Sequence, residues 1–218
     1  MEKKKLEEEK KIKIKLKKNM EPWLHVVLDL DGTLVDEDSG GSAGPFFRPH
    51  VAELFHALFS VCKSVSLWTA ASSEWLEEVR RAMHTNQLLP PGATFLHTWH
   101  GARCSRTINR RAIEDGEFYS TPLSIKRLRK MWAVAAYNVG GTLTRDTVLI
   151  LDNTPTTYLE NFGNAVPVPT WRASQEQDQA LLRLADWIAH MSEHHRHGTV
   201  RHTNKRLWWC TSPSVGKE

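Results

Sequence analysis

Three kinds of feature are scarce or missing in this chain of 218 residues. Cysteine occurs only three times, at positions 62, 104 and 210, which disfavours a disulfide framework and favours a reducing compartment. No run reaches the about 18 uncharged apolar residues of a membrane span, because Glu53, His56 and Lys63 interrupt the best candidate. The N-terminus carries charges where a secretory signal has an apolar segment. We therefore expect an intracellular protein, nuclear or cytoplasmic, without a membrane span.

Positive charge is scarce in the middle of the chain, although the whole chain carries +4 at pH 7. The two ends, residues 1–19 and 194–218, together carry +9, so residues 20–193 carry −5. This balance disfavours a nucleic-acid-binding core, which normally has a basic face. The basic ends themselves allow recruitment to an acidic or nucleic-acid partner. Residues 20–193 contain enough apolar sequence for one sizeable domain core.

The two ends are predicted to lie outside that domain. Residues 1–19 read as a charged N-terminal arm, or as a leader that precedes an alternative start at Met20. The alternation over residues 11–16 also fits a weak edge strand. Residues 194–218 form a basic, His-rich tail. Its His spacing fits a metal site, but Glu193 is the one acid nearby, which favours a solvated tail.

Two acids follow a buried strand near the start of the domain. Residues 23–28 form a nearly continuous apolar run, which is typical of a strand buried on both faces of a parallel sheet. Asp29 and Asp31 come next, at the end of the strand where open α/β sheets bind their ligands. The sequence Asp-Leu-Asp-Gly by itself also fits a simple turn. Two neighbouring carboxylates beside a Gly-Thr turn nevertheless suit a hard cation such as Mg²⁺.

Two later strands end in polar residues as well. The apolar run 61–68 ends in Thr69, before a helix N-terminus that suits a phosphate, although Thr69 also fits the start of a turn. The apolar strand at 147–151 ends in Asp152 and Asn153. Lys126 precedes that strand, early in a helix predicted over residues 124–132. Polar residues that converge at one edge of a parallel sheet are hard to attribute to turn chemistry alone.

The remaining pattern predicts an α/β fold, with a central parallel sheet flanked by helices. The region 85–122 is irregular and reads as a small insertion, built as a β-ribbon. Further expected elements are a loop at 36–45, a helix at 51–59, a helix at 74–83 capped by Ser72 or Ser73, an edge strand at 164–171 and a helix at 175–191.

The motifs in their order resemble a known family. Asp-Leu-Asp-Gly-Thr-Leu-Val at 29–35, Arg-Pro at 48–49, Trp-Thr-Ala at 68–70, Lys-Arg-Leu at 126–128, Leu-Asp-Asn-Thr-Pro at 151–155 and Asn-Ala-Val-Pro-Val at 164–168 are similar to the FCP/SCP phosphatases of the haloacid dehalogenase (HAD) superfamily. These include C-terminal-domain phosphatases and nuclear-LIM-interactor-like relatives. The resemblance implies a HAD-like Rossmannoid fold with no large cap domain. Gly32 departs from many family members, which carry Glu there.

The resemblance also implies a Mg²⁺-dependent mechanism with an aspartyl-phosphate intermediate. In it, Asp29 is the nucleophile and Asp31 is the general acid and base. The metal is held by Asp29, the Asp31 main-chain carbonyl and the Asp152–Asn153 pair. The site residues expected to contact or balance the charge of the phosphate are Thr33, Thr69, Lys126 and the insertion arginine Arg103.

Few residues separate Val35 from Thr69, which is too short for a large cap, so we expect an open site. An open site admits a phosphorylated protein segment, such as an RNA polymerase II C-terminal-domain-like tail. The leading prediction is therefore a protein serine/threonine phosphatase. A small-molecule or nucleotide phosphatase of the same superfamily and a catalytically weak phosphopeptide-binding scaffold are the alternatives. For Arg103, a solvated surface role stays open as well.

Overall fold

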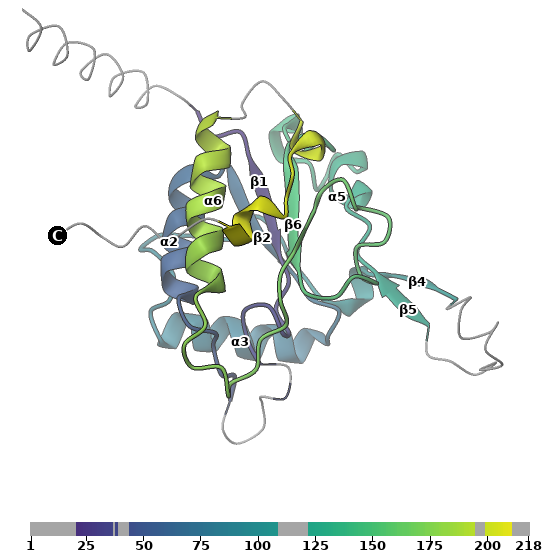
Figure 1. Ribbon diagram of the computed structural model, residues 1–218. Helices are drawn as coiled ribbons and strands as arrows, with labels where there is room; N and C mark the ends of the chain where they lie inside the picture. Colours follow the sequence, from purple (N-terminus) through teal and green to yellow (C-terminus); the bar gives the residue numbers. More distant parts are fainter. Residues whose placement is uncertain (1–20, 37, 39–43, 109–121, 195–198, 211–218) are drawn as a thin grey trace, which may run out of the picture.

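A five-stranded parallel sheet forms the centre of the computed structural model, which describes residues 21–36, 38, 44–108, 122–194 and 199–210 (Figure 1). Neighbouring strands lie in the order β3-β2-β1-β6-β7, and every neighbouring pair is parallel. The predicted α/β class is thereby confirmed, and the proline-containing strand lies at an edge, as expected. The strands are β1 (His25–Leu28), β2 (Ser64–Trp68), β3 (Thr98–Trp99), β6 (Val148–Asp152) and β7 (Ala165–Pro167).

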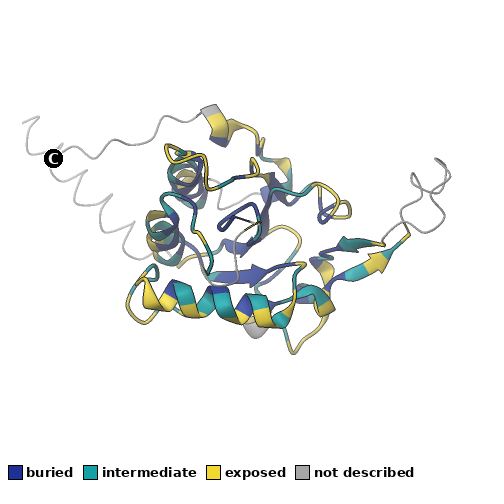
Figure 2. Ribbon diagram, turned by 90° about the horizontal axis from the view of Figure 1, so that it is seen from below, coloured by how far each residue is buried: buried dark blue, intermediate teal, exposed yellow. Residues whose placement is uncertain are grey.

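Both faces of the sheet are covered by other elements. Alternate residues of each strand point to opposite sides, so each strand contributes apolar side chains to both packed layers. Val26 and Leu28 pack with α2 (Val51–Val61), α3 (Ser73–Thr85) and α6 (Ala180–His194) in one apolar cluster. Val27 and Ile150 point the other way and pack with Met131 of α5 (Arg129–Ala133). Figure 2 shows the buried strands between the flanking layers. The continuous apolar runs in the sequence reflect this burial on both faces.

Residues 199–210 pack against the domain, although the sequence suggested a solvated tail there. They contain two short 3₁₀ helices, η4 (Val200–His202) and η5 (Leu207–Cys210). Val200 and Trp208 are buried in the same apolar cluster as α2 and α6. The Val200 amide also donates a hydrogen bond of 3.0 Å to the Asp146 carbonyl. This part of the chain therefore contributes to the core.

The insertion contains the predicted β-ribbon, in which β4 (Ser105–Thr107) pairs antiparallel with β5 (Leu123–Ile125). The helix predicted over residues 124–132 is wrong in its first half. Pairing with β4 extends the chain up to Ile125, and the Lys126 amide then donates to the Thr157 carbonyl at 2.7 Å. Helical periodicity there yields to tertiary hydrogen bonding, and α5 begins only at Arg129.

The other predicted helices form with shifted ends. Helix α3 begins where expected, and the Ser72 hydroxyl accepts a hydrogen bond from the Trp75 amide. Helix α6 begins at Ala180 rather than 175, because an Asp178 carboxylate oxygen accepts from the Ala180 amide at 3.0 Å. Among the described residues, no helix is long and apolar enough to cross a membrane. The predicted arm at 1–19 and most of the loop at 36–45 lie outside the described residues.

Candidate active site

The turn after β1 carries both acids of the first motif. The Asp29 amide donates to the Leu151 carbonyl, which keeps this residue in line with β6. The chain then folds back, and the Leu30 carbonyl accepts from three amides, those of residues 33, 34 and 35. Gly32 has φ of 72°, and a Cβ atom there would lie 2.4 Å from the Asn153 amide nitrogen. Glycine at this position therefore fits both the tight turn and the close approach of the Asn153 side chain.

Lys126 joins the turn after β1 to the end of β6. Its Nζ atom forms ion pairs with Asp29 Oδ1 and, at 2.8 Å, with Asp152 Oδ2. All three side chains are buried. The Asp152 carboxylate also accepts from the Thr157 hydroxyl and the Thr154 amide, at 2.7 and 2.8 Å. Two buried carboxylates thus share one cation, which leaves an excess of negative charge.

The excess of negative charge shifts the pKa values of Asp29 and Lys126. Burial and the charge of Asp152 raise the pKa of Asp29 to about 7, against the opposing effect of Lys126. Burial disfavours the charge of Lys126, but Asp29 and Asp152 outweigh it and raise the pKa of the lysine. Lys126 is therefore cationic at neutral pH. A further cation near Asp29 would relieve the repulsion between the two carboxylates.

Thr33 connects Asp29 to Asn153. Its hydroxyl donates to Asp29 Oδ2 at 3.0 Å and lies 3.3 Å from Asn153 Oδ1. The Asn153 amide donates back to that hydroxyl at 3.2 Å. The Asn153 side-chain nitrogen donates to the Thr170 hydroxyl. These contacts bring the predicted residues of β1 and β6 into one hydrogen-bonded group.

Asp31 is held separately, by two donors from the segment that follows β2. The Thr69 hydroxyl donates to Asp31 Oδ2 at 2.6 Å, and the Trp75 indole N–H donates to Oδ1 at 2.5 Å. Thr69 is fully buried and also accepts from the Ala71 amide. Its hydroxyl therefore contacts Asp31, while the sequence suggested a contact with phosphate. Trp75 was not predicted as a site residue.

The oxygen atoms present fit a Mg²⁺ ion. The predicted set contains the carboxylates of Asp29 and Asp152, the Asn153 amide oxygen and the Asp31 carbonyl. Mg²⁺ sites commonly use one or two carboxylates together with neutral oxygens and water. Within the described residues, no hydrogen bond is donated to the Asp31 carbonyl. No cluster of three His, Cys, Asp or Glu side chains suited to a metal occurs in the described part of the chain.

Arg103 is the one predicted site residue that lies apart from this group. Its guanidinium donates to the Tyr137 hydroxyl and lies over the rings of Tyr137 and Trp99, 5.1 and 5.6 Å from their centres. The Lys130 ammonium donates to its carbonyl at 2.6 Å. Among the described residues, no hydrogen bond or ion pair joins Arg103 to another predicted site residue. It belongs to an aromatic group at the base of the insertion.

Arg48 supports the turn after β1 through the Thr33 carbonyl. It was not predicted as a site residue. Its guanidinium donates to the carbonyls of Thr33 and Pro169, at 3.2 and 2.9 Å, and forms two bonds to Asp178, at 2.8 and 2.9 Å. The side chain is fully buried. The Arg-Pro pair at 48–49 is one of the motifs that resemble the FCP/SCP family. Arg48 ties the Asp29–Val35 turn to the segment before α6.

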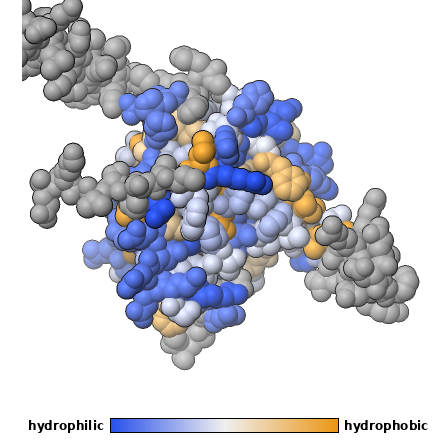
Figure 3. Space-filling view, in the orientation of Figure 1, coloured by the Kyte–Doolittle hydropathy of each residue, from blue (hydrophilic) through white to orange (hydrophobic). Residues whose placement is uncertain are grey.

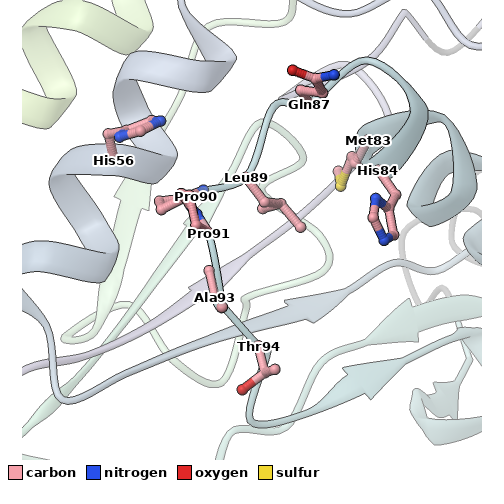
Figure 4. Close-up of a pocket in the computed structure, with 10 residues that line it drawn as sticks. His56, Met83, His84, Gln87, Leu89, Pro90, Pro91, Ala93 and Thr94 are labelled. Atoms are coloured by element: carbon pink, nitrogen blue, oxygen red, sulfur yellow. The ribbon is translucent and has the colours of Figure 1, made fainter.

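A pocket of 570 Å³ lies elsewhere, between α2, the end of α3 and the loop that follows α3 (Figure 4). Its walls are mostly apolar, with His56 and His84 on opposite sides in the view. None of the predicted site residues lines it. The candidate chemistry is therefore located by the convergence of charged side chains at the strand ends, and not by the volume of a cavity.

A family profile and several solved structures match this chain. A sequence profile of NLI interacting factor-like phosphatases matches residues 24–201. The RNA polymerase II CTD phosphatase Fcp1 of fission yeast, bound to beryllium fluoride, is 14% identical; the alignment covers 86% of this chain and 56% of that one, with a TM-score of 0.40. This chain thus spans little more than half of the Fcp1 chain. A search of curated proteins found no match.

Two bacterial structures are similar to about the same degree. A probable YrbI family phosphatase from Pseudomonas syringae is 13% identical over 78% of this chain and 86% of that one, with a TM-score of 0.45. The cobalt-bound deoxy-D-mannose-octulosonate 8-phosphate phosphatase of Haemophilus influenzae is 13% identical over 79% and 94%, with a TM-score of 0.38.

Proposed function

The chain belongs to the NLI interacting factor-like phosphatases of the HAD superfamily, and on this premise we propose that it is a Mg²⁺-dependent protein serine/threonine phosphatase. One observation carries the proposal. Asp29, Asp152 and Lys126 meet at the carboxyl ends of β1 and β6, with an excess of negative charge. Phosphoryl transfer needs a nucleophile, cations and a proton donor. This group offers the nucleophile, one cation and an excess of negative charge that attracts another, and Asp31 on the same turn offers the proton donor.

Asp29 is the proposed nucleophile. One of its carboxylate oxygens attacks phosphorus, and the bond from phosphorus to the serine or threonine oxygen breaks, which leaves an aspartyl-phosphate. Lys126 and Thr33 contact the two oxygens of Asp29 and hold the carboxylate in a fixed orientation. Lys126 also offsets the charge that accumulates when a phosphate approaches. Bound Mg²⁺ would supply further charge neutralisation, held by Asp29, Asp152, Asn153 and the Asp31 carbonyl.

Asp31 is the proposed general acid and base. In the first step it donates a proton to the departing oxygen of the substrate. In the second step it removes a proton from water, whose oxygen attacks phosphorus and breaks its bond to Asp29. The products are inorganic phosphate and free Asp29, and Asp31 is again protonated. Thr69 and Trp75 fix its carboxylate for both transfers.

A phosphorylated protein segment is the proposed substrate, such as an RNA polymerase II C-terminal-domain-like tail. The described residues between Val35 and Thr69 contain the single helix α2 and the strand β2, and no cap domain. A small-molecule or nucleotide substrate is the alternative from the same superfamily. A metabolite panel that is hydrolysed orders of magnitude faster than phosphopeptides would select that alternative.

The test is hydrolysis of an aryl phosphate and of a phosphopeptide array, with Mg²⁺ and with a chelator. We expect turnover in Mg²⁺, with loss on chelation and in the Asp29→Asn variant. Turnover that survives either treatment would exclude the proposed mechanism. Phosphopeptide binding without turnover in any metal would instead identify a scaffold that has kept the fold.

A further inference from the structure

A second pocket, lined by charged side chains, lies on the face of the sheet that α5 covers. Its volume is 330 Å³, and four arginines contribute to its walls. We call it the arginine pocket. Hydrophilic side chains gather in this part of the molecule in Figure 3, where Figure 1 places α5. Its lining residues are Arg127, Arg129, Trp132, Arg145, Glu160, Asn161, Asn164 and Arg201.

This pocket lies away from the acids of the candidate active site. Arg145 precedes β6, and Asn164 directly precedes β7. The Asn164 side chain donates to the carbonyls of Arg145 and Val148, where β6 begins. Asp152 lies at the other end of the same strand. At about 3.3 Å per residue, the four residue steps from Val148 to Asp152 put roughly 13 Å between the two ends of β6.

Two buried asparagines hold the segments that carry the arginines. Asn164 accepts from the Arg201 guanidinium at 2.8 Å, in addition to its bonds near Arg145. Asn161 donates to the Lys126 carbonyl and accepts from the Leu128 amide, the residues on either side of Arg127. These amide contacts fix the backbone around Arg127 and Arg145 and hold the guanidinium of Arg201. The pocket is therefore built by the fold rather than by mobile side chains alone.

The position of Arg201 is further restricted by Gly163. A Cβ atom at residue 163 would lie 2.6 Å from the centre of the Arg201 guanidinium. Any larger residue would push the guanidinium out of its place. Glycine here allows the arginine to lie directly over the backbone, which presets its orientation.

The lining carries more positive charge than its own acid can balance. Glu160 is its single acid, and it pairs with Arg127 at 2.6 Å. Arg129 and Arg145 are exposed, and no described residue forms a side-chain ion pair or hydrogen bond with either of them. The lining therefore has a net charge of +3 in a domain whose residues 20–193 carry −5. Such a local excess favours an anionic ligand.

We propose that the arginine pocket binds the phosphate of a second phosphorylated serine or threonine in a protein segment. This rests on the proposed function, in which the first phosphorylated residue enters the Asp29 site. Guanidinium groups pair with phosphate through two parallel hydrogen bonds. Trp132 offers an apolar wall for the neighbouring side chains. The pocket has room for one phosphorylated side chain, whereas a nucleic acid binds along an extended basic track, and residues 20–193 together carry −5.

The separation of the two sites sets a minimum spacing in the substrate. An extended chain covers at most about 3.6 Å per residue, so the span of β6 alone requires about four residue steps, that is, about three residues between the two phosphorylated residues. A path over the surface is longer. Peptides with about twelve residues between two phosphoserines are therefore expected to reach both sites, and peptides with two residues between them only one.

The experiment measures kcat and KM of the full chain on three peptides: singly phosphorylated, doubly phosphorylated with the wide spacing, and doubly phosphorylated with the narrow spacing. The variant is Arg129→Ala/Arg145→Ala, and the control is Arg81→Ala, an exposed arginine of α3. We expect the KM of the widely spaced peptide to rise about tenfold or more in the variant, because two charge-assisted contacts are lost. The kcat for this peptide and the turnover of an aryl phosphate are expected to be the same in the variant and the wild type. The control stays within about twofold.

Equilibrium binding of the labelled, widely spaced peptide, measured by fluorescence anisotropy with a chelator present, separates this proposal from the proposed function. If the chain hydrolyses nothing, the proposed function fails, and a tenfold loss of binding in the variant still supports the pocket. Equal binding by the wild type and the variant overturns it. So does an equal loss in Arg81→Ala or with the narrow spacing, because both point to general electrostatics. Tighter, Arg129-dependent binding of an RNA oligonucleotide overturns the assignment to a phosphopeptide.

Discussion

Lys126 and Arg48 are both buried cations that support the turn after β1, but their surroundings differ in charge. Arg48 faces one carboxylate, that of Asp178, and two carbonyls, so its charge is balanced. Lys126 faces the two carboxylates of Asp29 and Asp152, which leaves one negative charge over. A balanced buried pair serves structure. An unbalanced one has capacity for another cation, and here it lies where a phosphate would need charge neutralisation.

The strongest test of this difference is Asp29→Asn, which removes the excess charge at Lys126. We expect turnover of an aryl phosphate to fall by about 10⁴-fold or more, since an amide cannot act as the nucleophile. The fold should be retained, because the amide has nearly the same size and ends the repulsion with Asp152. Turnover is measured in Mg²⁺, and folding by urea titration. A variant that loses its fold along with its activity would contradict the comparison.

The second test breaks the balanced pair. Arg48→Met leaves Asp178 without its cation, and removal of one partner of a buried pair costs about 3–5 kcal/mol. The free energy of unfolding is measured by urea titration. The matched control is Arg48→Met/Asp178→Asn, which removes both charges, keeps a side-chain oxygen for the Ala180 amide and is expected to recover much of the loss. If the double variant is no more stable than Arg48→Met, the cost does not arise from an unpaired charge.

The sequence was sufficient to predict the strands that carry the acids. Long apolar runs followed by Asp29 or Asp152 have few interpretations in an α/β chain, and the parallel order places their ends together. Lys126 was predicted as a site residue but on the wrong element. Its position depends on pairing between β4 and β5 and on the Thr157 carbonyl, which no local pattern encodes. Helical periodicity alone therefore misplaced the backbone around it.

Trp75 and Arg48 were missed for a similar reason. Trp75 lies in the first turn of a helix that Ser72 caps, so its helical position could be predicted, but its contact with Asp31 depends on how α3 crosses the sheet. Arg48 pairs with an acid 130 residues later. For Arg103 the resemblance suggested a substrate contact, which stays a prediction; its packing over Trp99 and Tyr137 was not predicted. Contacts between distant segments were the limit of the prediction.

The third test weakens the hold on Asp31 and leaves the charge at Lys126 unchanged. Trp75→Phe removes the indole N–H that donates to Asp31 Oδ1. We expect kcat to fall about tenfold with phosphoserine peptides, since proton transfer depends on a well-placed donor. An aryl phosphate has a better leaving group and needs less protonation, so its loss should be smaller. Trp209→Phe, at an exposed position, is the control, and equal losses on both substrates would argue against a role through Asp31.

The smallest expected effect is a pH dependence of stability that compares the two ends of β1. Burial, aided by the charge of Lys63, lowers the pKa of His25 to about 4. The unfolded chain therefore binds more protons there between pH 4 and 6.5, and stability falls as pH falls. At Asp29 the raised pKa makes the folded chain bind more protons between pH 4 and 7, so stability rises as pH falls. The two slopes, each up to about 1.4 kcal/mol per pH unit, largely cancel in the wild type.

Single variants should reveal each slope in urea titrations with a chelator present. Asp29→Asn leaves the His25 contribution, so its stability should fall from pH 6.5 to 4, while His25→Asn should become relatively more stable over the same range. Saturating Mg²⁺ should steepen the wild-type loss at low pH, because a metal-bound Asp29 no longer takes up a proton. Identical pH profiles of the wild type and Asp29→Asn would mean that the Asp29–Asp152 repulsion is absent. The excess charge at Lys126 would then have no thermodynamic consequence, and the contrast with Arg48 would be one of geometry alone.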